Sequence, residues 1–222
     1  MEESRYAKPG EPASQPPVGR RQQQGDDKRK AILDAALVLF SRKGLHGASV
    51  DQIAALAEVS KGNLLYYFES KDVLYRSVLR QLLALWLEPL RSFSASQDPE
   101  TAIGDYIRRK LEASRDNPQA SRLFCMELVQ GAPLFGEELS LELRDLVERK
   151  AEVIRAWVAG GKLAAVEPHH LIFTLWSVTQ HYADFAVQVE AITGRTLADP
   201  LFFDEVLGNL RGIVLGGVLP RG

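Results

Sequence analysis

The sequence predicts an all-α protein, in which an N-terminal helix-turn-helix domain is joined by a long helix to a C-terminal helical bundle. Apolar residues recur at helical spacing along most of the chain, and no segment alternates apolar and polar residues as a strand would. Pro and Gly separate the periodic segments from one another. With 222 residues, the chain is long enough for one small and one larger domain.

The N-terminal end is the exception to this pattern. Residues 1–27 are rich in Pro, Gly and Gln and contain few apolar side chains. A segment of this composition cannot bury a core, so we expect a disordered tail. The helix-turn-helix domain is then expected over residues 28–72 and the helical bundle over residues 73–222.

The first two helices of the small domain have clear boundaries. A helix is expected from about Lys28 to Lys43, and Gly44 can adopt the left-handed conformation that ends it. Ser49 is placed to cap the second helix, because Gln52 follows three residues later and completes a capping box.

Two further serines mark the next helices. Ser60 is expected to cap a short third helix that ends near Phe68. Ser70 then caps a long fourth helix that begins at Lys71 and is bent or ended by Pro89.

The rest of the chain reads as a series of helices. Their expected ranges are about 99–116, 118–130, 137–159, 168–192 and 200–217. The last two carry apolar residues on more than one face, which favours one face for the core and another for a partner chain.

The third helix is the candidate DNA reader, because a short helix presented by a tight turn fits the major groove. Gly62 permits a close approach to DNA, and Asn63 can pair with base edges, preferably adenine. Lys61 and Lys71 suit phosphates. For Tyr66 and Tyr67, phosphate contact and packing in the domain core remain alternatives. The candidate DNA-binding residues are Ser49, Ser60, Lys61, Gly62, Asn63, Tyr66, Tyr67 and Lys71.

The charge distribution agrees with a DNA-binding N-terminal part. From Arg20 to Arg80 there are eleven Lys and Arg against seven Asp and Glu, a net charge of +4, whereas residues 81–222 carry −5. The net charge of the whole chain is −2.

The run S-V-D-Q-I-A-x-x-A-x-V-S-K-G-N-L-x-Y-Y-F-x-S-K resembles the TetR family of bacterial one-component regulators. This resemblance covers about Lys28 to Leu79. It implies a homodimer, mainly a repressor, that binds near-palindromic operator DNA. It also implies that residues 73–222 form a ligand-binding and dimerisation domain, where a small molecule releases the DNA.

Trp176 and Gln180 are the leading candidates for a ligand site. They are four residues apart and share one helix face. An amide beside an indole suits a flat heterocycle such as uracil, whose imide N–H lies between carbonyls. The alternative is that Trp176 lies in the core or at a dimer surface and that Gln180 bonds a neighbouring carbonyl.

The segments Asn117–Pro133 and His170–Gly194, together with the runs L-L-Y-Y-F and W-L-E-P-L, resemble pyrimidine-responsive members of the same family. The similarity runs from about Lys28 to the end of the chain. This similarity implies an effector such as uracil or thymine and control of pyrimidine catabolism. It adds Arg122, Trp86 and Phe124 as weaker pocket candidates. A different small aromatic effector and a ligand-independent DNA-organising protein remain alternatives, and residues 135–155 are less similar.

Other classes of protein fit poorly. No apolar run approaches the ~20 residues that span a bilayer, no signal peptide is evident, and Cys125 is the single cysteine, so we expect a cytoplasmic chain. His169, His170 and His181 are the obvious metal or catalytic candidates. However, no H-E-x-x-H motif, phosphate loop or nucleophile elbow accompanies them. We therefore expect no enzyme activity, no metal and no cofactor.

Overall fold

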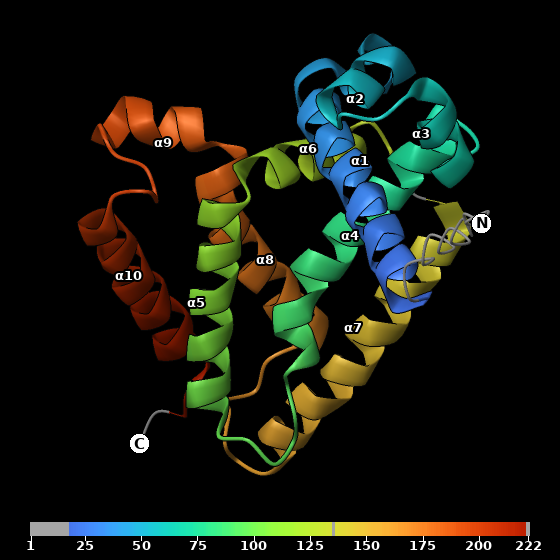
Figure 1. Ribbon diagram of the computed structural model, residues 1–222. Helices are drawn as coiled ribbons and strands as arrows, with labels where there is room; N and C mark the ends of the chain where they lie inside the picture. The colour runs from blue at the N-terminus through green and yellow to red at the C-terminus, as the bar shows by residue number, and fades with distance from the viewer. Residues whose placement is uncertain (1–17, 135, 221–222) are drawn as a thin grey trace, which may run out of the picture.

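The computed structural model describes residues 18–134 and 136–220, and within these ranges it contains ten helices and no strand. The all-α fold class is therefore confirmed. Figure 1 shows a small group of helices from the N-terminal part of the chain, located at one end of a larger set of long helices. We call the small N-terminal group the head and the larger set the body.

The head follows the expected capping signals. It consists of α1 (Val18–Gly47), α2 (Val50–Leu56) and α3 (Lys61–Tyr67). The Ser49 hydroxyl accepts a hydrogen bond from the Gln52 N–H, and both halves of the capping box are present. Gly44, with φ of 68° and ψ of 178°, interrupts the helical geometry of α1 at the predicted position.

The boundary of the first helix differs from the prediction. Helix α1 begins at Val18 and not at Lys28, so residues 18–27 extend the helix instead of belonging to a disordered tail. Glutamine has reasonable helix propensity, and three glutamines occupy positions 22–24. The overall composition of residues 1–27 does not reveal this local preference. The predicted tail over residues 1–17 lies outside the described residues.

Helix α4 (Lys71–Arg91) runs from the head into the body and carries Pro89 in its last turn. The body contains α5 (Pro99–Asp116), α6 (Pro118–Val129), α7 (Gly136–Ala159), α8 (Pro168–Asp184), α9 (Ala186–Thr193) and α10 (Pro200–Val218). Helices α5, α6, α8 and α10 each begin with Pro at the first position, where its missing N–H has no helical partner to lose.

One body helix was predicted wrongly. Residues 168–192 were expected to form a single helix, but Phe185 has φ of −114° and ψ of 31° and separates α8 from α9. No Gly or Pro marks this break, and the apolar periodicity of the sequence continues across it. The sequence pattern therefore does not predict the break. The break turns α9 away from α8 (Figure 1).

The interior of the body is built around α5, which packs between α8 and α10 (Figure 1). Its buried face contains Ile103, Tyr106, Ile107, Lys110 and Leu111. None of the helices in the described ranges combines the length and apolarity needed to span a membrane.

Candidate DNA-reading and effector sites

The candidate reading helix α3 presents a polar and open first turn. The Ser60 hydroxyl accepts a hydrogen bond from the Asn63 N–H at 3.1 Å and so fixes the start of the helix. Space is open beside Gly62, because no atom outside its chain neighbours and its own helix backbone lies within 4 Å of the position that a Cβ would take. This turn therefore allows a close approach of another molecule to the backbone.

The two lysines beside α3 already have partners. The Lys61 ammonium forms an ion pair with Asp51 of α2 at 3.0 Å, and both side chains are exposed. The Lys71 ammonium donates to the carbonyl of Ala48 at 3.1 Å and ties the start of α4 to the α1–α2 loop. A phosphate near either lysine would compete with these interactions.

The two tyrosines have different surroundings. Tyr66 is 84% exposed, whereas Tyr67 is half-buried and packed against the head core. Phe68 is buried, and the Arg29 guanidinium lies 5.1 Å from the centre of its ring. Tyr66 is therefore the tyrosine that projects from the head surface.

In the body, Trp176 and Gln180 share one groove, as their spacing predicts. The groove has a volume of about 310 Å³ and is lined by Trp176, Ser177, Gln180, His181, Asp184 and Phe185. The Gln180 amide makes no hydrogen bond to any described residue. It is thus free to bind another molecule.

The three weaker ligand candidates do not join this groove. Trp86 and Phe124 are buried in the body core, and neither contributes to the groove lining. Arg122 is exposed and lines a different cavity, next to the end of α1. Of the five candidates, Trp176 and Gln180 line this groove and the other three do not, because helix spacing fixes neighbours on α8 but not across helices; the role of Arg122, Trp86 and Phe124 in ligand binding stays a prediction.

A partly buried polar cluster adjoins the groove, and residue spacing along the sequence does not predict it. It consists of Lys110 of α5, Ser121 and Cys125 of α6, and Asp184 of α8. The Ser121 hydroxyl donates to the Asp184 carboxylate, which also lines the groove. The available signal was that Lys110 falls on the apolar face of its helix, four residues after Tyr106.

The charges in this cluster are strongly perturbed. Burial lowers the pKa of Lys110 to about 7, although Asp184 opposes this change. Burial also raises the pKa of the Asp184 carboxyl, against the hydrogen bond from Ser121 and the attraction of Lys110. No ion pair within 4 Å joins Lys110 to any described residue.

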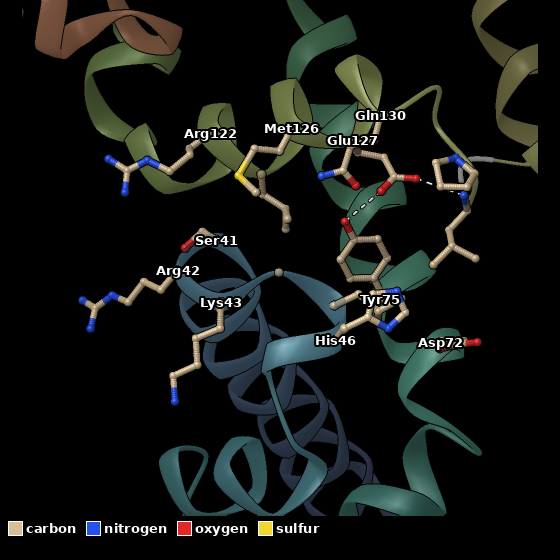
Figure 2. A pocket seen from close by; sticks show the side chains of 15 residues that line it. Ser41, Arg42, Lys43, His46, Asp72, Tyr75, Arg122, Met126, Glu127 and Gln130 are labelled. Carbon is tan, nitrogen blue, oxygen red and sulfur yellow. Dashed lines mark hydrogen bonds between the residues drawn. The ribbon is translucent and has the colours of Figure 1, made fainter.

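A separate cavity of about 720 Å³ lies where the head meets the body, between the end of α1, the start of α4 and α6. Figure 2 shows Arg42, Lys43 and Arg122 on one side of it and Tyr75 and Glu127 on the other. The Tyr75 hydroxyl donates to the buried Glu127 carboxylate at 2.8 Å, and the Leu134 N–H donates to the other Glu127 oxygen at 2.9 Å.

This arrangement joins the two parts of the molecule mechanically. Tyr75 also packs edge to face against Phe40 of α1, with ring centres 4.9 Å apart. Burial is the main reason why the pKa of Tyr75 is raised, so the hydroxyl keeps its proton and remains a donor to Glu127. The Tyr75–Glu127 hydrogen bond and the Phe40–Tyr75 contact thus connect α6 to α4 and α1.

An exposed third helix in a small head, carried by a long helix on an all-helical body, defines a helix-turn-helix regulator. The family model for bacterial regulatory proteins of the tetR family matches residues 32–78. The model for the C-terminal region of YcdC-like proteins matches residues 79–221. The chain belongs to the TetR family and is a DNA-binding transcriptional regulator, a class of proteins that are not enzymes.

Among known proteins, the chain is similar to the HTH-type transcriptional regulator RutR of Escherichia coli strain K12. The two are 55% identical over 204 residues, which cover 92% of this chain and 96% of that protein. RutR of Shigella flexneri gives the same identity and coverage. The transcriptional repressor NicS of Pseudomonas putida is 36% identical over 91 residues, which cover 40% of this chain and 43% of that protein.

Solved structures agree on the fold. The putative transcriptional regulator SCO4942 from Streptomyces coelicolor matches with a TM-score of 0.68 at 24% identity, over 88% of this chain and 99% of that one. A putative fatty acid metabolism regulator from Clostridium perfringens matches with a TM-score of 0.64 at 21% identity, over 86% of this chain and all of that one.

Proposed function

We propose that the protein is a pyrimidine-responsive repressor, which binds operator DNA as a homodimer and is released by uracil or thymine to permit pyrimidine catabolism. The observation that carries the proposal is the 55% identity to RutR along nearly the whole of both chains, body included. A regulator of this class acts on chromosomal DNA, so its place would be the cytoplasm.

The groove on α8 is the proposed effector entrance. Trp176 offers a flat indole face, and the unpaired Gln180 amide offers one donor and one acceptor. Uracil presents the complementary edge, an N–H beside carbonyl oxygens. Cytosine presents an amino group and an unprotonated ring nitrogen there, so the amide would discriminate between the two ligands.

The reading helix is the proposed base-contacting element. Asn63 is in the first turn of α3, next to Gly62, and would pair with a base edge. Lys61, Lys71 and the exposed Tyr66 would bind phosphates, with Ser49 and Ser60 donating near the helix starts. Tyr67 would support the position of Tyr66, since their rings pack edge to face with centres 5.4 Å apart.

The proposed dimer surface lies on α8, α9 and α10. Large apolar side chains are exposed there, namely Phe173, Phe185, Val187, Ile192, Leu201 and Ile213. Two copies that pair through this surface would present two reading helices about 34–36 Å apart, one turn of B-DNA. Effector binding can weaken DNA affinity only if the ligand prefers a different spacing of the heads.

A DNA-release assay tests the proposal. Binding sites would first be selected from random duplex DNA with the purified protein, and anisotropy of a labelled site would then be followed during addition of uracil, thymine or cytosine. Uracil and thymine should release the DNA, with cytosine much weaker. DNA binding that none of the three changes would leave a DNA-binding regulator with another effector or with none.

A further inference from the structure

The body contains a lysine in a place where lysine is rarely found. Lys110 is 1% exposed and lies on the buried face of α5, between α4 and α8. Its ammonium lies 4.6 Å from the centre of the Trp86 ring, yet it makes no hydrogen bond to any described residue. Buried ammonium groups are normally paired, because burial removes their hydration.

Two more hydrogen-bond donors beside Lys110 are also buried and unsatisfied. The Trp86 indole N–H and the Tyr106 hydroxyl have no hydrogen-bond partner in the described part of the chain. Tyr106 precedes Lys110 by one helical turn and so points to the same side of α5. Few native proteins leave several such groups unpaired in one place without a reason.

This set of donors adjoins the groove described above. The Tyr106 hydroxyl lies next to the indole of Trp176, without a hydrogen bond of normal geometry. Asp184 faces Lys110 on one side and lines the groove on the other. Trp176 and Asp184 therefore separate the groove from the unsatisfied donors, and a ligand that turns either side chain would reach Lys110.

We propose that Lys110 is a specificity-determining residue of the effector site, which selects planar cyclic amides by donating a hydrogen bond to a ring carbonyl oxygen. The inference rests on the proposed function and extends it beyond Trp176 and Gln180. Three unpaired donors require acceptors, and a ligand with two carbonyl oxygens supplies them. The single carboxylate of the cluster, Asp184, can accept from a ring N–H of the same ligand.

A purely structural role for Lys110 makes a different prediction. If the ammonium served to neutralise Asp184 in the folded core, its removal would destabilise the protein. The separation of more than 4 Å argues against a tight pair, and a buried cation without partners is often replaced by an apolar side chain at no cost in stability. The Lys110→Met variant should therefore melt at or above the temperature of the original protein.

The test compares ligands that differ by one carbonyl. Uracil, pyrimidin-2-one and pyrimidin-4-one would be titrated by calorimetry, with weak ligands measured by competition, into the original protein, Lys110→Met and the control Lys162→Met. Lys162 is exposed in the α7–α8 loop. We expect Lys110→Met to lose about tenfold or more in uracil affinity. The preference of Lys110→Met for uracil over one of the two analogues should vanish. Lys162→Met should keep the uracil affinity and the ligand preference of the original protein.

The outcomes separate the two proposals. If the original protein does not bind uracil, the proposed function fails first. If it binds uracil and folded Lys110→Met retains the same affinity and the same preferences, the role of Lys110 is wrong. Should the methionine variant not fold, Lys110→Gln would be judged by the same loss of preference, since its shorter amide cannot reach the same carbonyl oxygen.

Discussion

The head and the body of this regulator place their candidate sites in opposite ways. In the head, the candidate residues follow one another along α3 and are exposed around its first turn, as Lys61 and Gly62 illustrate. In the body, the candidates come from α5, α6 and α8, and Lys110 is buried. A surface that reads DNA can thus be encoded locally, whereas a site that senses a small molecule depends on how distant helices pack.

The largest expected effect is on the free energy of unfolding and concerns the packing of α1 against α4. Phe40 is fully buried in α1 and packs against Tyr75 of α4. Phe40→Ala should lower the free energy of unfolding by about 3–5 kcal/mol, through lost burial and a residual cavity. Urea denaturation would measure this change. The control Leu141→Ala, at a half-exposed position on α7 outside the proposed dimer surface, should change stability much less, and equal losses would contradict the assignment of the core.

The next prediction separates sensing from DNA binding. Gln180→Leu removes the unpaired amide of the groove while keeping a similar volume. The DNA affinity should remain within about twofold, and uracil affinity should fall by about 1–3 kcal/mol, because the ligand edge would lose its partner. Anisotropy with and without uracil measures both. Uracil release at the original concentration in this variant would exclude Gln180 from the site.

In the head, a substitution should change DNA binding and leave uracil binding unchanged. Asn63→Ala should weaken binding to the selected DNA by about 1–3 kcal/mol and relax the choice of base at one position of each half-site. Calorimetry with uracil should be unchanged, because α3 does not reach the body site. A uniform loss of affinity on all sequences would instead assign Asn63 to the phosphate backbone.

A substitution at the contact between the head and the body should weaken the link between them and leave both candidate sites intact. Tyr75→Phe removes the hydroxyl that donates to the buried Glu127 carboxylate, which is left with the Leu134 N–H. We expect a loss of about 1–3 kcal/mol in stability, measured by urea denaturation. The factor by which uracil changes DNA affinity should also decrease. A stable variant with full coupling would mean that the signal passes elsewhere.

The smallest effect concerns pH and is confined to the body. Hydrogen bonds to Glu167 and Glu148 raise the pKa of His169, which links the start of α8 to α7. Because the folded pKa is the higher one, this contribution is fully present below about pH 6.5 and is lost as pH rises through the folded pKa. The His169→Gln variant should lose that part of the pH dependence in melting experiments. An unchanged profile would assign it to another group.

The sequence could predict the head almost completely, because its structure is set by local signals. Ser49, Gly44 and Ser60 cap or end helices where expected, and hydrogen bonds of the predicted kind are present. The extension of α1 to Val18 is not apparent from the sequence, because residues 1–27 share a Pro-rich and Gln-rich composition. In this respect local propensity was a better guide than average composition.

The body was less predictable for a physical reason. Trp176 and Gln180 share a groove because both are on α8. No spacing rule shows that Arg122 lines a different cavity from this groove, that Trp86 is buried in the core, or that Lys110 lies near Asp184. The break at Phe185 was also hidden, since it arises from packing and not from Gly or Pro. Tertiary contacts decide such features, and a single sequence does not display them.

The most direct test of a pyrimidine-sensing body is a calorimetric titration of uracil into the folded protein, with cytosine as the comparison. The account predicts saturable uracil binding, with one site for each chain and much weaker binding of cytosine. Absence of any saturable uracil binding, or equal affinity for cytosine, would contradict it and leave a TetR-family regulator whose effector is a different molecule.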